Sequence, residues 1–497
     1  MGIQSRVRKL LAQTISKVGA LHSSEERFPP PKCHPDTRTA VLKELSHWIT
    51  AGYWKRFEKT FLPHSLSRTF ERNAAAQSGA SIADTKSTSP SGSFQIRPDR
   101  DSVPIYWLYG PAGVGKSAIA QTLCERFEVS RGGKHLIASF FFSRSSPTRN
   151  NPQYLFLTIA YCLATFSHDS SLRSAIDNAI QKHPAILEGS IEAQFHELIV
   201  QPLRSISLWR KWRIPKLVII DGLDECADSH SQRLVLTTIL DALVDNTSKS
   251  FPFRIPLRFL IVSRPEPAIR EIFSRSRFYG NSNRTVLDDS FATSRDIEVY
   301  LRDEFSRILE THPTIPLPWP PPGVIDEIVQ RASGQFIYAS TVLKYVADEH
   351  SFPPERLDVV LGLPLSDAEA FVDLDVLYRQ ILVSTPQTRW KFVVHALAFV
   401  LLTSKISHVL IMEQIFELPK GSVSVALRGL SSVLNISFIS DSVVLYHKSF
   451  ADFLQDQRRS RDFSVNLNMY REEFVNRCGE RMDSIDLQAE FPLGSNQ

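Results

Sequence analysis

The sequence predicts an α/β protein whose doubly wound parallel sheet is followed by a helical domain and a small winged-helix domain. Four continuous apolar runs are typical of strands buried on both faces of a sheet. They lie at residues 104–110, 135–143, 216–222 and 257–264. Helical patterns separate these runs, as in residues 116–127, where Ile119, Leu123 and Phe127 recur every fourth residue. After about residue 290 the strand signals fade and amphipathic helices follow, so the sheet is expected to end there.

The chain divides into six predicted segments. They are an N-terminal helical segment (1–62), a flexible insert (63–100), the α/β core (101–288), a helical domain (289–370), a winged-helix-like domain (371–462) and a C-terminal helix (463–497). The insert is rich in Ser, Ala and Thr and has few large apolar residues, so it cannot bury enough surface to offset the entropy of ordering. The winged-helix prediction rests on helices that end in a β-rich patch at 437–454.

Composition excludes several classes of protein. The 497 residues are 43% hydrophobic and 22% charged, as in ordinary globular proteins. A net charge of +4 with scattered basic residues gives no nucleic-acid-binding surface. Five cysteines without a CxxC pair indicate neither a zinc site nor a disulfide framework. The longest apolar stretch, residues 392–402, is too short to span a bilayer, so we expect a soluble, cytoplasmic protein that binds no membrane.

The strongest signal is a glycine-rich loop between the first predicted strand and the next helix. It matches the pattern G-x-x-x-x-G-K-[ST], and its predicted nucleotide-binding residues are Gly110, Pro111, Ala112, Gly113, Val114, Gly115, Lys116, Ser117 and the following Ala118. The glycines let successive N–H groups face one anion, and the helix adds its partial positive charge. Lys116 is expected to reach the β- and γ-phosphates and Ser117 to bind Mg²⁺. The alternative is a tight glycine turn without a ligand.

Acidic residues follow the third apolar run. Asp221 ends that run, at the carboxyl edge of the sheet beside the glycine-rich loop, and is the predicted second Mg²⁺ ligand. Asp224 and Glu225 are predicted to orient or activate a water molecule, although such residues also cap helices. Arg264 follows the fourth run and is predicted to sense the γ-phosphate; the alternative is a surface arginine before a proline turn.

Taken together, these segments resemble fungal NACHT-domain proteins, which belong to the signal-transducing P-loop NTPases (the STAND class) and are related to the nephrocystin-like N-terminal module. The resemblance lies in residues 110–125, 140–144, 157–164, 217–226 and 258–267, in this order. Weaker resemblance extends to residues 23–38, 331–346, 374–382 and 445–454.

The resemblance implies a nucleotide-controlled switch that uses ATP or GTP with Mg²⁺. In this class a winged-helix domain folds over the nucleotide, and a histidine touches the phosphates of the diphosphate state; by motif position this is His447. The alternative is a partly buried histidine in a hairpin. Gly334 to Phe336 are expected near the base. Family members usually carry an effector domain before the core and a repeat array after it. We therefore expect a shortened member, or one whose sensor and effector parts lie on partner proteins, and self-association of the chain.

Several functions remain open at this point. The first is a slow NTPase switch, and the second is a turnover enzyme such as a small-molecule kinase, with Arg144 and Arg149 in a possible lid. A hydrolysis-deficient scaffold is the third; the presence of Lys116, Ser117, Asp221 and Glu225 argues against it. The fourth, nucleic-acid binding through the winged helix, lacks a basic stripe.

Overall fold

A computed structural model describes most of the chain. The described residues are 11–61, 101, 103–128, 135–144, 146–244, 255–287, 291–348, 351–362, 372–383, 385, 387–403, 407–430, 432–437, 442–445 and 447–481. The predicted flexible insert at 63–100 lies outside them, as do the ends of the chain at 1–10 and 482–497.

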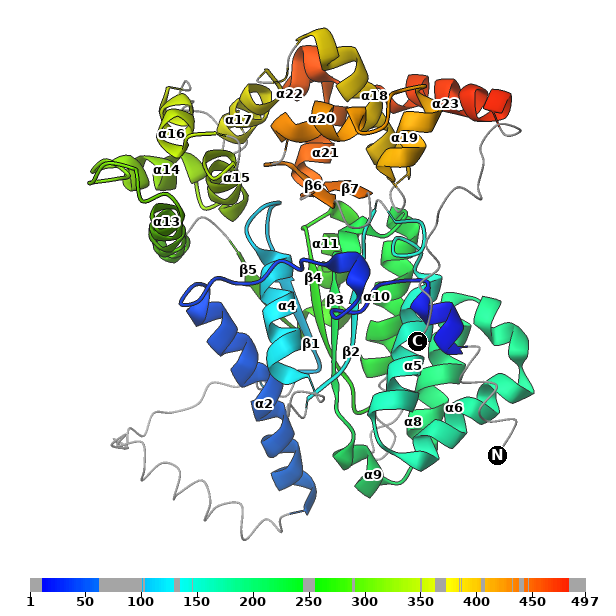
Figure 1. Cartoon of the computed structure of the whole chain (residues 1–497). Coiled ribbons are helices and arrows are strands. Elements are labelled where there is room, and N and C mark those ends of the chain that lie inside the picture. The colour runs from blue at the N-terminus through cyan, green and yellow to red at the C-terminus, as the bar shows by residue number, and fades with distance from the viewer. Residues whose placement is uncertain are drawn as a thin grey trace, which may run out of the picture.

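A five-stranded parallel sheet lies at the centre of the first half of the chain (Figure 1). Its strands are β1 (Ile105–Tyr109), β2 (Leu136–Phe141), β3 (Leu217–Asp221), β4 (Arg258–Ser263) and β5 (Ser282–Val286). They are ordered β2-β3-β4-β1-β5, and every neighbouring pair is parallel. The predicted parallel sheet is therefore confirmed, and the first four strands coincide with the four apolar runs. Because β4 lies between β1 and β3, the loops that follow these three strands meet at one edge.

The fifth strand was not predicted. Residues 282–286 have the sequence SNRTV and are only partly buried, and β5 is an edge strand beside β1. An edge strand needs no continuous apolar run, so the sequence carried no strand signal there.

Helices cover both faces of the sheet, because alternate residues of each strand point to opposite sides. Val218 and Ile220 of β3 pack into one hydrophobic cluster, and Leu217 and Ile219 into another. The first cluster includes residues of α5 (Gln153–Phe166), α6 (Ser170–Lys182), α7 (Ile191–Phe195), α8 (Gln201–Ser205), α10 (Ser229–Val244) and α11 (Pro267–Ser274). The second includes residues of α2 (Thr39–Phe61) and α4 (Lys116–Phe127). Two short helices, α9 (Leu208–Arg213) and α12 (Ser276–Tyr279), precede β3 and β5.

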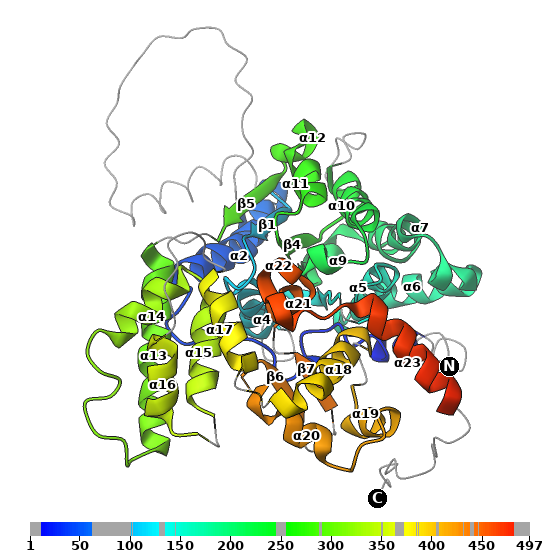
Figure 2. The same cartoon turned by 90° about the horizontal axis from the view of Figure 1, so that it is seen from above.

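A second, mainly helical unit follows the sheet and shares one hydrophobic cluster that runs from Ile297 to Phe474. Its helices are α13 (Phe291–Thr311), α14 (Val324–Ala332), α15 (Phe336–Val346), α16 (Pro353–Leu361), α17 (Val372–Val383), α18 (Gln387–Thr403), α19 (Val409–Ile415), α20 (Ser422–Leu427), α21 (Lys448–Gln455), α22 (Gln457–Ser460) and α23 (Leu467–Arg481). An antiparallel hairpin of β6 (Leu434–Ser437) and β7 (Ser442–Leu445) lies between α20 and α21. Seen from above, α21 and α22 lie over the region of α4, between α13–α17 and α23 (Figure 2).

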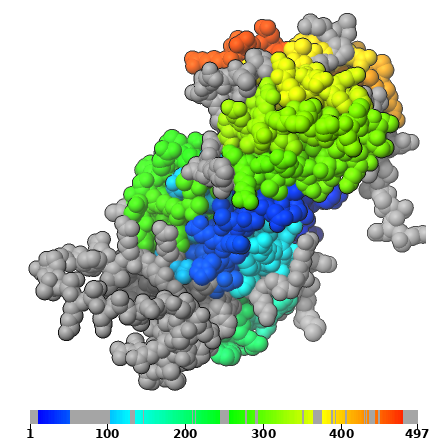
Figure 3. All heavy atoms as spheres, turned by 90° about the vertical axis from the view of Figure 1, so that its left-hand side faces the viewer, coloured from blue at the N-terminus to red at the C-terminus, as the bar shows by residue number. Residues whose placement is uncertain are grey.

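The N-terminal segment lies between the sheet domain and the helical unit (Figure 3). His34 Nε2 lies 2.8 Å from Asp303 Oδ2 of α13, and the Arg38 backbone N–H donates to Asp296 Oδ2 at 2.9 Å. On the other side, the Phe141 N–H of β2 donates to the Ala20 carbonyl at 2.9 Å. The segment therefore connects the two halves of the molecule. Among the residues that the structure describes, no helix combines the length and apolarity needed to cross a membrane.

Candidate functional site

The glycine-rich loop joins the end of β1 to the start of α4. Gly113 and Gly115 have φ angles of +79° and +88°, in the left-handed region that only glycine adopts without strain. Lys116 begins α4, and its Nζ donates to the carbonyl oxygens of Gly110 at 2.9 Å and Pro111 at 2.5 Å. Burial lowers the pKa of Lys116 to about 8, while the charge of Asp224 acts to raise it. The loop therefore holds a cation and a helix N-terminus at one point, which is the arrangement that binds phosphate.

Ser117 and Asp221 are in direct contact across the site. The Ser117 hydroxyl is hydrogen-bonded to the Asp221 carboxylate at the end of β3. Burial raises the pKa of Asp221 to about 6, and the hydrogen bond from Ser117 and the charge of Arg27 oppose the shift. Both side chains offer oxygen atoms at the same point, and oxygen atoms are the ligands that Mg²⁺ prefers. These two side chains fit a shared Mg²⁺.

The two acidic residues after Asp221 have different surroundings. Asp224 is only 3% exposed, and its Oδ1 accepts the backbone N–H of Arg264 at 3.0 Å. Glu225 is partly exposed, and its Oε2 accepts the backbone N–H of Arg144 at 3.1 Å. Glu225 is thus the one that remains accessible to water, whereas Asp224 anchors Arg264.

Arg264 joins the sheet domain to the helical unit. Its Nε lies 3.5 Å from Asp224 Oδ2, and its Nη1 and Nη2 each donate to Asp452 Oδ2 of α21 at 3.2 Å. The sequence alternative, an arginine exposed before a proline turn, does not describe this position, because the side chain is 23% exposed and paired with two carboxylates.

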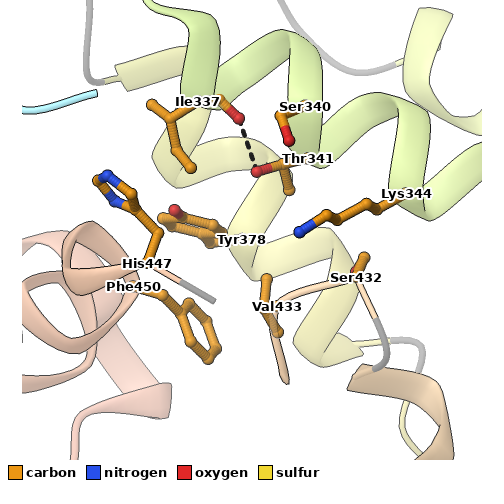
Figure 4. Close-up of a pocket in the computed structure, with 9 residues that line it drawn as sticks. All are labelled: Ile337, Ser340, Thr341, Lys344, Tyr378, Ser432, Val433, His447 and Phe450. Atoms are coloured by element: carbon orange, nitrogen blue, oxygen red, sulfur yellow. Dashed lines mark hydrogen bonds between the residues drawn. The ribbon is translucent and has the colours of Figure 1, made fainter. Parts of the chain in front are cut away.

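His447 is the N-cap residue of α21. Its Nδ1 accepts the backbone N–H of Ser449 at 3.0 Å, so the neutral ring carries its proton on Nε2. Figure 4 shows His447 at the side of a small pocket whose other lining residues include Ile337, Lys344 and Tyr378.

The pocket and the glycine-rich loop share one neighbour, the start of α15. The Ile337 N–H donates to the Gly113 carbonyl at 3.2 Å, and Ile337 also lines the pocket. The segment predicted near the base, Gly334 to Phe336, directly precedes this contact. His447 and the glycine-rich loop therefore both lie near the start of α15. Contact between His447 and a phosphate stays a prediction.

Two arginines of the N-terminal segment were not selected from the sequence. Arg27 is electrostatically coupled to Asp221, and its guanidinium carbon lies 3.4 Å from the centre of the Phe141 ring. Arg38 is 6% exposed and donates from Nη2 to the Val114 carbonyl of the glycine-rich loop at 2.7 Å. Only the family resemblance drew attention to the segment that contains these two arginines. In a turn-rich stretch, no local sequence pattern distinguishes an arginine that becomes buried from one that stays exposed.

The site and the sheet define the class of protein: an α/β domain of P-loop type, with the loop after β1 and the acidic strand end at β3. Within this class, residues 92–264 match the family model described as Nephrocystin 3, N-terminal. The match covers about a third of the chain and confirms the predicted resemblance to the nephrocystin-like module for these residues. No curated protein matches the chain.

Solved structures that are similar to the chain include the following two. One is a Signal Transduction ATPase with Numerous Domains (STAND) protein with a tetratricopeptide repeat sensor from Pyrococcus horikoshii, with 10% identity and a TM-score of 0.42. The match covers 78% of this chain and 44% of that chain, so this chain spans less than half of its length. The other is the ORC2 protein of Aeropyrum pernix in ADPNP and ADP complexes, with 12% identity, a TM-score of 0.32 and coverage of 77% and 89%. Both TM-scores are low, and the fold assignment rests on the strand order and the loop.

Proposed function

We propose that this chain is a NACHT-type switch that binds ATP or GTP with Mg²⁺, hydrolyses it slowly, and couples the nucleotide state to opening of its domains. The observation that supports this most is the hydrogen bond between Ser117 and Asp221 beside the Lys116 loop. A glycine turn without a ligand has no need for a buried carboxylate at this point, because burying an ionisable group costs free energy.

Each residue then has a distinct role. The N–H groups of the loop and the Lys116 ammonium hold the phosphates, and Ser117 and Asp221 hold the metal ion. Mg²⁺, when bound, supplies neutralisation of the phosphate charge. Glu225 orients the attacking water, since its carboxylate is the accessible one, and Asp224 positions Arg264.

The switch requires a second unit that can occupy two positions. The proposed winged-helix domain, residues 371–462, contains the helices α18–α20 and the β6–β7 hairpin, and the Val443 N–H of the hairpin donates to the Ser407 carbonyl before α19 at 2.9 Å. The contacts of this domain with the sheet domain include the ion pair between Arg264 and Asp452, which lies on α21 after the hairpin. A ligand that binds one arrangement more tightly shifts the population toward it. The open arrangement would expose surfaces for self-association or for effector and sensor proteins.

The experiment is to identify the nucleotide that co-purifies with the protein and to titrate nucleotide-free protein with ATP and GTP, with and without Mg²⁺. Lys116→Ala should lose most of the triphosphate affinity, whereas Lys43→Ala, which removes an exposed lysine of α2, should bind normally. Absence of Mg²⁺-dependent uptake of either purine triphosphate by the unmodified protein would overturn the proposal.

A further inference from the structure

A histidine and two carboxylates from two distant parts of the chain meet where the N-terminal segment contacts α13. His34 Nε2 lies 2.8 Å from Asp303 Oδ2 and 3.9 Å from Glu304 Oε1. The three donor atoms all lie within 4.8 Å of one another. His34 and Asp303 are 269 positions apart, so tertiary packing forms this cluster and a local run of acidic residues does not.

The His34 ring is held with one nitrogen directed at the carboxylates. Its side chain is 11% exposed and packs edge-on against the Tyr300 ring of α13, with 5.3 Å between the ring centroids. His34 Nδ1 lies 3.0 Å from the Pro35 carbonyl oxygen, which only accepts hydrogen bonds, so Nδ1 carries a proton. In the neutral ring Nε2 is then unprotonated and offers its lone pair to the cluster. Metal-binding histidines have this same arrangement, in which the other ring nitrogen donates to a carbonyl.

The short distance between His34 Nε2 and the Asp303 carboxylate requires a positive charge between them. Two acceptor atoms repel each other at 2.8 Å unless a proton or a metal ion lies between them. Arg307 neutralises the carboxylates from the side, because its Nη2 lies 3.0 Å from Asp303 Oδ2 and its Nη1 lies 2.7 Å from Glu304 Oε1. The Arg307 side chain is 57% exposed, and exposed ion pairs within one helix contribute little to stability. A metal ion therefore displaces Arg307 at little cost.

We propose that His34, Asp303 and Glu304 form a Zn²⁺ site that fastens the N-terminal segment to α13. One imidazole nitrogen and two carboxylate oxygens are ligands that Zn²⁺ takes, and they leave the fourth of its tetrahedral positions for water. Mg²⁺ and Ca²⁺ prefer oxygen ligands, so the imidazole nitrogen favours zinc. The bound ion stabilises the segment from which Arg38 reaches the glycine-rich loop. The site is separate from the residues proposed to hold the nucleotide, and it goes beyond the proposed function.

The test is calorimetric titration of the full chain with zinc chloride. His34→Gln removes the nitrogen ligand and should weaken Zn²⁺ binding at least about a hundredfold, since even the outer-shell partners of a metal ligand are worth about 10–100-fold. Glu304→Gln removes one oxygen ligand and should weaken binding at least about tenfold, the lower end of that range. The control, His47→Gln, removes an exposed histidine whose Nε2 lies 3.4 Å from Asp101 Oδ2, and it should bind Zn²⁺ like the unmodified protein.

Two further variants separate this site from its competitors. Asp221→Asn detects Zn²⁺ that binds at the proposed Mg²⁺ site, and binding at His34 should persist in this variant. Arg307→Gln removes the competing guanidinium and should tighten Zn²⁺ binding about threefold. In thermal unfolding, Zn²⁺ should raise the midpoint of the unmodified protein but not that of His34→Gln.

Zn²⁺ binding that is lost in Asp221→Asn and kept in His34→Gln would overturn the proposal. If the unmodified protein takes up no Zn²⁺, a proton alone bridges His34 and Asp303, and the proposal fails. Thermal unfolding in the presence of EDTA shows whether each variant is folded, and Glu304→Gln, which changes a partly exposed side chain, decides the matter should His34→Gln not fold. Failure of nucleotide binding would leave this test unaffected.

Discussion

The contact between Gly113 and Ile337 leads to a sharp prediction about the coupling of the glycine-rich loop to α15. A Cβ atom added at Gly113 would lie 2.3 Å from Ile337 Cγ2, whereas one added at Gly115 would meet nothing within 4 Å. Both glycines have a φ that costs an alanine about 1–2 kcal/mol. Only Gly113→Ala also overpacks a β-branched side chain, which adds about 1–3 kcal/mol. Gly113→Ala should therefore destabilise the protein by about 1–3 kcal/mol more than Gly115→Ala.

Urea unfolding of both variants measures this difference, and a double-mutant cycle with Ile337→Ala isolates the contact. Ile337→Ala removes the clashing Cγ2, so the added cost of Gly113→Ala should largely disappear in that background. Hydrogen exchange of the Ile337 amide, which donates to the Gly113 carbonyl, should be faster in Gly113→Ala and unchanged in Gly115→Ala. Equal destabilisation by the two alanines, or a coupling energy near zero, would refute the proposed contact between the loop and α15.

Three further predictions concern the site. Burial raises the pKa of Asp221 to about 6, so the folded protein binds this proton more tightly than the unfolded chain, and the contribution of Asp221 to stability should fall as pH rises from about 4 to 6. In urea unfolding, the free energy of unfolding of Asp221→Asn should therefore rise by about 3 kcal/mol relative to that of the unmodified protein over this pH range. A difference that does not depend on pH would contradict this prediction. Arg38→Lys replaces a guanidinium group that donates hydrogen bonds to both Val114 and Thr293, so calorimetry should show about tenfold weaker binding of nucleoside diphosphate and triphosphate alike. Weaker binding of only one of the two nucleotides would argue against a role of Arg38 in supporting the glycine-rich loop. Glu225→Gln should bind triphosphate normally but hydrolyse it about a hundredfold more slowly in a phosphate-release assay; an unchanged rate would move water activation to the preceding aspartate.

The sequence was most informative where the relevant residues are contiguous. Lys116 and Ser117 belong to one loop, and Asp221 ends one apolar run, so strand and loop patterns were enough to select them. The structure brings Ser117 and Asp221 into contact because β1 and β3 are separated only by β4. The parallel arrangement of the strands thus places residues from two separate sequence motifs next to each other.

The sequence was least informative where the contacts are long-range or the surroundings polar. Arg264 and Asp452 are 188 positions apart, and their pairing depends on how α21 is placed against the sheet domain. Arg38 contacts Val114 across 76 positions from a turn-rich segment. The strand at 282–286 is polar and only partly buried, so it has no apolar run. Such features follow from tertiary packing, which residue periodicity does not encode.

The path of residues 20–38 has a practical consequence for anyone who expresses a part of this protein. The Ala20 carbonyl accepts a hydrogen bond from the Phe141 N–H of the edge strand β2, and Arg27 and Arg38 reach the acidic strand end and the glycine-rich loop from the same segment. A fragment cut at residue 92, where the family match begins, would lose this hydrogen bond and discard both guanidinium groups. Such a fragment should bind nucleotide poorly, so the unit that binds begins upstream of the motif by which the domain is recognised.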